Sequence, residues 1–112
     1  MKHITYAEKS ILVGDDAADA LLDYAKVIAI AGTADTVTLR SISPDGNTVD
    51  ASILLTATTM LIVESTNSVV EPPSNEVAIA DIRRRIEAIH HPATVEPETQ
   101  SPSVAPDDLD FY

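Results

Sequence analysis

Two stretches of strict alternation flank a turn in the middle of the chain. Residues 36–40 and 48–53 place apolar and polar side chains at every second position, which is the period of a half-buried strand. Pro44, Gly46 and Asn47 lie between the two stretches. Proline presets φ, and glycine and asparagine accept a positive φ. The pattern therefore predicts a β-hairpin.

Pairing Ile42 with Thr48 sets the register of this hairpin. One face then becomes apolar and the other polar, with an opposite-charge pair on the polar side. A slip by one residue would turn every apolar side chain to the wrong face, so this agreement supports the register. The predicted cross-strand pairs are Val37–Ile53, Thr38–Ser52, Leu39–Ala51 and Arg40–Asp50.

Apolar periodicity predicts two helices. Residues 17–31 are rich in alanine and leucine, with Asp15 placed as the N-cap and Gly32 as the residue that ends the helix. Residues 76–90, capped by Ser74 or Asn75, carry isoleucines at spacings of three and four. The first helix is apolar beyond one stripe, so we expect the sheet to contact one side and the second helix or another subunit the other. The stripes are Ala18, Leu21, Leu22, Ala25, Ile28, Ala29 in the first helix and Ile79, Ile82, Ile86, Ile89 in the second.

Residues 3–13 and 59–65 are rich in β-formers, and each predicts one further strand. The predicted order is β-α-β-β-β-α. The fold class is α+β, with a small antiparallel or mixed sheet and helices on one face. Residues 1–91 form the compact domain. Residues 92–112 hold four prolines and five acidic residues without apolar periodicity, which predicts a disordered acidic tail.

Charge and composition restrict the partners. The net charge is −11, of which residues 1–91 carry −6 (7 basic, 13 acidic) and residues 92–112 carry −5. Such a chain repels nucleic acid and anionic membranes, because phosphate neutralisation needs clustered Lys and Arg. There is no cysteine and no apolar run long enough to span a bilayer. The residues after Met1 lack the apolar core of a signal peptide, so we expect a cytoplasmic protein.

Three clusters of polar residues favour structural roles over chemistry. Asp16, Asp19 and Asp23 share one side of the first helix, but Ca²⁺ and Mg²⁺ sites draw ligands from a tight loop or from converging elements. Neighbouring histidines at 90 and 91 point about 100° apart on a helix. The arginines at 83–85 are expected to contact acidic residues within the chain. With no nucleophile motif or phosphate loop, we predict no catalytic residue, no cofactor and no metal.

The C-terminal tip differs from the rest of the tail. Its two aromatic residues are not needed for folding and could fill an apolar pocket, while its acids would face a basic rim. The tip resembles the acidic, Phe-ended tails of bacterial single-stranded DNA-binding proteins, which recruit partners through basic-rimmed pockets. Here Asp110 replaces their usual proline, and Tyr112 follows the final Phe. The predicted partner-binding residues are Asp107, Asp108, Leu109, Asp110, Phe111 and Tyr112.

A second resemblance concerns residues 1–66. The segment 6–10 (YAEKS), followed by Gly14-Asp15 and by residues 34–37 (ADTV), resembles short uncharacterised actinobacterial α/β proteins. This resemblance implies no function.

The sequence favours a non-catalytic interaction or adaptor protein whose C-terminal tip binds a protein with a basic-rimmed pocket. Two alternatives stay open. One is a structural homodimer built on the apolar first helix. The other is a small ligand-binding protein or enzyme with a site under the sheet.

Overall fold

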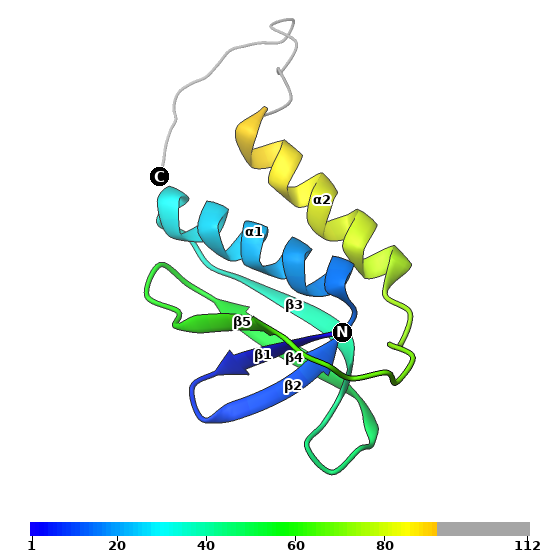
Figure 1. Ribbon diagram of the computed structural model, residues 1–112. Helices are drawn as coiled ribbons and strands as arrows, with labels where there is room; N and C mark the ends of the chain where they lie inside the picture. Colours follow the sequence, from blue (N-terminus) through cyan, green and yellow to red (C-terminus); the bar gives the residue numbers. More distant parts are fainter. Residues whose placement is uncertain (92–112) are drawn as a thin grey trace, which may run out of the picture.

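The computed structural model describes residues 1–91. One antiparallel sheet carries all the described strands in the order β4-β3-β2-β1-β5, and both helices lie on one face of it (Figure 1). The predicted α+β class is confirmed. The elements are β1 (Lys2–Tyr6), β2 (Lys9–Val13), α1 (Asp15–Ala31), β3 (Asp35–Ile42), β4 (Thr48–Leu55), β5 (Leu61–Ser65) and α2 (Glu76–His90).

The single strand predicted over residues 3–13 is wrong, because this segment is a hairpin. β1 and β2 pair antiparallel through Tyr6 and Lys9, and only two residues connect them. The first of these, Ala7, has a φ of 56°. A two-residue turn with a positive φ at its first central position suits glycine best. Alanine gives no such signal in the sequence, and the order is therefore ββαβββα.

The hairpin of β3 and β4 has the predicted register at every position from Asp35–Leu55 to Ile42–Thr48. Its turn closes with the Gly46 amide donating to the Ser43 carbonyl at 2.9 Å, and Gly46 has a φ of 88°. A turn followed by a left-handed glycine is a common three-residue hairpin connection. The proline, glycine and asparagine of this segment thus encode the turn that they form.

Helix α1 begins two residues earlier than predicted. Gly14 is the N-cap, and Asp15 lies in the first turn without a side-chain cap bond. Gly32 ends the helix with a φ of 67°, as predicted. The predicted apolar stripe is wrong at Leu22 and Ala29, which are both exposed, whereas Tyr24, which lies outside the stripe, is only 3% exposed.

The two sides of α1 have different partners. One side packs on the sheet through fully buried residues such as Ala18 and Leu21, and the other packs against α2. Ile82 is the buried centre of the α2 face and joins the same core as Ile28 and Val37. The expectation that α1 is contacted on two sides is therefore confirmed, with α2 as the second contact.

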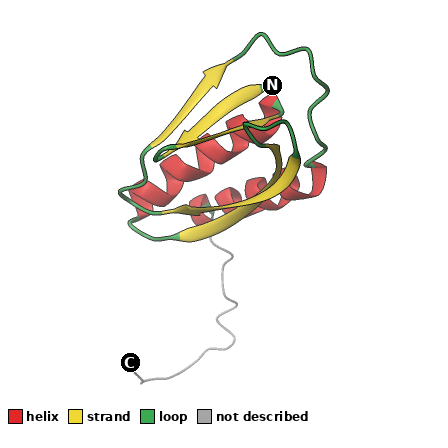
Figure 2. Cartoon of the chain, turned by 90° about the horizontal axis from the view of Figure 1, so that it is seen from below, coloured by secondary structure: helices red, strands yellow, loops and turns green. Residues whose placement is uncertain are grey.

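The hairpins β1–β2 and β3–β4 diverge from one another within the sheet. β2 and β3 pair only through Leu12 and Ile42, whereas β1–β2 and β3–β4 pair along their whole length. Seen from below, the strands lie in front of the two helices (Figure 2). α2 lies along the part of β3 that β2 leaves unpaired, where Asn75 and Arg85 contact the β3 backbone.

Candidate functional site

A cleft opens between the inner, helix-facing surfaces of the two hairpins. Its volume is about 550 Å³. Ile4 and Ile11 contribute from the first hairpin, and Val49, Ala51 and Ile53 contribute from β4. Because strand side chains alternate between the two faces of a sheet, these residues share the face that packs on α1. The cleft is thus an open continuation of the core, and we call it the inter-hairpin cleft.

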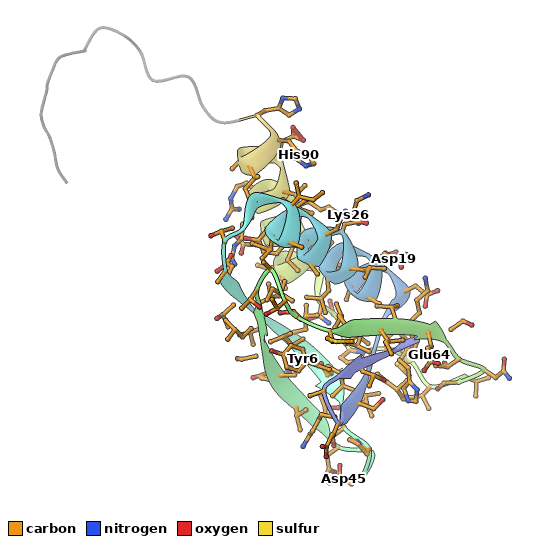
Figure 3. All side chains as sticks on the ribbon, turned by 90° about the vertical axis from the view of Figure 1, so that its left-hand side faces the viewer. Tyr6, Asp19, Lys26, Asp45, Glu64 and His90 are labelled. Atoms are coloured by element: carbon orange, nitrogen blue, oxygen red, sulfur yellow. The ribbon has the colours of Figure 1, made fainter. Side chains whose placement is uncertain are left out.

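Tyr6 closes one end of the inter-hairpin cleft. Its hydroxyl donates to the carbonyl of Leu54 at 2.9 Å, which links β1 to β4 across the curved sheet. Figure 3 shows Tyr6 among the strands, far from the helix end that carries His90. The apolar ring of Tyr6 lines the cleft and its polar end is satisfied.

The polar side chains near the cleft are mostly directed away from it. Asp50 binds Arg40 on the outer face of the sheet, with Oδ1 3.1 Å from Nε. Ser52 exchanges a hydrogen bond of 2.8 Å with Thr38 on the same face. Lys9 is the one charged side chain among the cleft-lining residues on the inner face. The cleft therefore suits apolar groups better than acid–base chemistry.

A second, larger groove of about 980 Å³ runs between α2 and the strands β3 and β4. Asn75 lies at one end, where its side chain accepts from the Arg40 amide at 2.8 Å and donates to the Arg40 carbonyl at 2.9 Å. The amide of Asn75 thus occupies the place of a neighbouring strand. It is therefore not the side-chain cap of α2 that the sequence predicts, although Asn75 is the N-cap residue.

The groove is bordered by a network that joins α1, β3 and α2. The hydroxyl of Tyr24 donates to Oδ2 of Asp35 at 2.5 Å, and Nη1 of Arg85 binds the same oxygen at 2.8 Å. Arg85 also donates to the Thr36 carbonyl at 3.2 Å. One carboxylate thus fixes the relative position of three elements.

This network shifts the pKa values of its members. The hydrogen bond from Tyr24 lowers the pKa of Asp35 below its ordinary value, and the Thr36 amide and Arg85 act in the same direction. Burial raises the pKa of Tyr24 above its ordinary value, and the hydrogen bond to Asp35 adds to this effect. Both shifts favour the state in which tyrosine is neutral and aspartate is ionised. At neutral pH this protonation state allows the Tyr24 hydroxyl and Arg85 to donate hydrogen bonds to the Asp35 carboxylate.

The arginines at 83–85 contact acidic residues of the chain, as predicted. Arg83 binds Asp23 of α1 at 2.7 Å, and Arg84 binds Asp81. Arg85 also binds Asp81 at 2.7 Å, the i,i+4 pair within α2. The cluster therefore ties α2 to itself and to α1.

The remaining predicted clusters lie apart from both cavities. Asp19 pairs with Lys2 at 2.8 Å, which raises the pKa of Lys2, and Asp23 pairs with Arg83. His91 lies 3.3 Å from Glu87 on exposed surface at the end of α2. No group of three or more potential metal ligands occurs within residues 1–91.

The predicted partner-binding residues, 107–112, lie outside the described residues. The sequence did not identify the inter-hairpin cleft or the Tyr24–Asp35 contact. The cleft depends on where two hairpins separate, and the contact joins residues whose roles become visible only after α1 and β3 are packed. In the described part of the chain, no helix is long and apolar enough to cross a membrane. Comparisons of the chain with protein families, with curated proteins and with solved structures found no match.

Proposed function

We propose that this chain is a non-catalytic interaction protein that binds a protein partner through its C-terminal tip, residues 107–112. The observation behind the non-catalytic part of the proposal is that charged side chains of the described domain form ion pairs between its helices and strands. Arg83, Arg85 and Lys2 each bind an aspartate on a different element. Groups that a catalytic site would need are thus used to hold the domain together.

The inter-hairpin cleft and the groove beside α2 support the same proposal. The hydroxyl of Ser43, on the rim of the inter-hairpin cleft, bonds with Asp45. No histidine is among the residues that line the cleft or the groove beside α2. A hydroxyl nucleophile paired with a histidine base, a common arrangement for covalent catalysis, is therefore missing from these two linings.

The binding function is assigned to the tip because of its composition. Phe111 and Tyr112 bring two apolar rings next to each other, and Asp107, Asp108 and Asp110 surround them with negative charge. A partner pocket with apolar walls and a basic rim matches both features. Rings that enter such a pocket supply the affinity, and the acids supply the rate of association and its salt sensitivity.

Affinity capture with paired baits tests the proposal. The baits are the full-length chain, the chain ending at Asp110, and the full-length chain with Glu96→Gln and Glu98→Gln. Partners captured by the full-length chain should be lost without Phe111 and Tyr112, and retained when the two glutamates are neutralised. Weakening of capture by added salt should accompany the first result. Recovery of every partner with the chain ending at Asp110 would exclude the tip.

A further inference from the structure

The free edge of β4 is the longest unprotected edge of the sheet. β4 is the terminal strand and pairs with β3 at eight consecutive positions without a bulge. Its sequence holds neither proline nor lysine. Edges that stay unpaired in natural proteins are usually short or carry charged residues, proline or a bulge. The one charged residue of β4, Asp50, is paired with Arg40 of the same chain, and the other features are missing from β4. We therefore expect another strand to cover this edge.

The direction of the β4 backbone groups follows from the pairing with β3. The Arg40 amide and carbonyl bind Asn75, on the side away from β4, so Arg40 and Asp50 form a non-hydrogen-bonded pair. The amide and carbonyl of Asp50 therefore point to the free edge, and by alternation those of Ser52 do as well. The Leu54 carbonyl agrees with this assignment, because it accepts from Tyr6 instead of β3.

The inter-hairpin cleft lies beside this same edge. Val49 and Ala51 line it from β4, and Val49 remains 36% exposed. A strand added to β4 would place every second side chain over the cleft. Apolar side chains on the added strand would fit best over the cleft. β4 itself has apolar residues at every second position, namely Val49, Ala51 and Ile53.

We propose that the free edge of β4 pairs with β4 of a second copy of this chain, antiparallel about a two-fold axis, with Asp50 opposite Ser52 of the partner chain. Ala51 then faces its own counterpart, and the two sheets become continuous. This assembly does not depend on the function proposed for the tip.

Charge selects this register among the neighbouring ones. A register with Asp50 opposite Asp50 would place two like charges face to face. A register with Ser52 opposite Ser52 would bring the Asp50 carboxylate opposite the aliphatic side chain of Leu54. In the proposed register Thr48 faces Leu54, whose carbonyl already accepts from Tyr6, so the backbone pairing rests on Asp50 and Ser52. In the proposed register four polar side chains form a row across the outer face. Arg40 and Asp50 come from one copy, and Ser52 and Thr38 follow from the other. Arg40 already bonds Asp50, and Thr38 already bonds Ser52, within each chain.

The inner face is complementary in the same register. Val49 of one copy faces Ile53 of the other, and the two Ala51 side chains meet at the axis. These residues line the two inter-hairpin clefts, so pairing covers both clefts and the exposed part of Val49. A self-complementary patch of this kind is what a two-fold interface requires.

Disulfide trapping tests the register directly, because the chain has no cysteine of its own. Facing residues of a non-hydrogen-bonded pair have Cα atoms about 4.5 Å apart, which a disulfide can span. Ala51→Cys should therefore form a covalent dimer under mild oxidation. The matched control Ser52→Cys should stay monomeric on a denaturing gel, since its thiol would face Asp50. Preferential cross-linking of Ser52→Cys, or of neither variant, would overturn the proposal.

Light scattering tests the interface without a cross-link. The native chain should approach twice 11.9 kDa as its concentration rises. Ser52→Pro removes an outward-pointing amide at two symmetric positions, so the dimer dissociation constant should rise about tenfold or more, whereas Ser52→Ala should leave it nearly unchanged. Circular dichroism checks folding, and if Ser52→Pro does not fold, the cross-linking pair decides. A native chain that stays at 11.9 kDa at all concentrations would refute the dimer. The same conclusion would follow if the edge of β4 bound a foreign peptide or small molecule while the chain stayed monomeric.

Discussion

At the scale of single residues, Asp35 has the most consequential position in the domain. It accepts from Tyr24 and Arg85 and thereby connects β3 to both helices. The sequence predicted that the arginines at 83–85 contact acidic residues of the chain, and Asp81–Arg85 is the local case, because residues four apart on a helix are neighbours. It did not predict the contacts of Asp35, since these join residues 11 and 50 positions away. Local contacts follow from spacing, whereas long-range contacts follow only from packing.

The lowered pKa of Asp35 makes the stability of the domain depend on pH. The folded state holds this carboxylate ionised to lower pH than the unfolded state, whose pKa is near 3.8. The contribution is therefore present above this value and lost as the pH falls through the lower folded pKa. The pKa of Tyr24 is raised from 10.0, so its contribution is present below this value and lost as the pH rises through the folded pKa.

Tyr24→Phe is expected to lower the free energy of unfolding by about 1 to 2 kcal/mol at pH 7, because it removes a hydrogen bond to a charged group. The difference from the native chain should shrink as the pH falls below 3.8 and Asp35 becomes protonated. Urea titrations at several pH values measure both quantities. The control Tyr6→Phe loses a bond to the neutral Leu54 carbonyl, so its deficit should stay constant over the same range. A Tyr24→Phe deficit that does not change with pH would contradict the assignment.

At the scale of elements, the quality of each sequence prediction depended on its turn. The connection between β3 and β4 contains proline, glycine and asparagine, and the register of this hairpin was predicted at every position. The connection between β1 and β2 is Ala7-Glu8, which contains no such residue, and the hairpin was read as one strand. The helix ends were predicted within two residues, because Gly32 and the prolines before α2 mark them.

Ala7→Gly is expected to stabilise the β1–β2 hairpin by about 0.5 to 1 kcal/mol. The φ of 56° at Ala7 is unfavourable for an L-residue with a Cβ atom, and glycine removes that strain. The gain is reduced by the greater freedom of glycine in the unfolded chain. Thermal and urea unfolding measure the change. The adjacent substitution Glu8→Gly, at a residue without positive φ, should instead leave the domain equally stable or less stable.

Asn75→Ala is expected to loosen the attachment of α2 to β3. The substitution leaves the Arg40 amide and carbonyl without their protein partner, and since the site is exposed, water replaces part of the loss. The cost should be about 1 kcal/mol. Hydrogen exchange of the Arg40 amide should accelerate, whereas Ser74→Ala, at an exposed neighbouring position, should leave it unchanged. Equal exchange rates in the two variants would show that Asn75 does not protect this edge.

At the scale of the whole molecule, the sequence predicted the class of the fold and a first helix contacted on two sides, by the sheet and by either the second helix or another subunit. It did not predict the inter-hairpin cleft. That cleft exists because β2 and β3 share a single pair, Leu12–Ile42, which no local pattern encodes. The boundary at residue 91 rests on composition and stays a prediction. Ile89 is 36% exposed, and His90 and His91 are exposed as well.

The chain ending at His91 is therefore expected to fold as the full-length chain does. The contacts that hold α2 in place come from Asn75, Ile82, Arg83 and Arg85, all of which this truncation keeps. Removal of residues 92–112 also takes away five negative charges from a chain of −11, which reduces self-repulsion. The change in the free energy of unfolding should stay within about 0.5 kcal/mol. Calorimetry of both chains at equal molar concentration and at two salt concentrations measures it. A melting temperature several degrees lower for the truncated chain, at both salt concentrations, would mean that residues 92–112 pack on the domain, and the boundary would have to move.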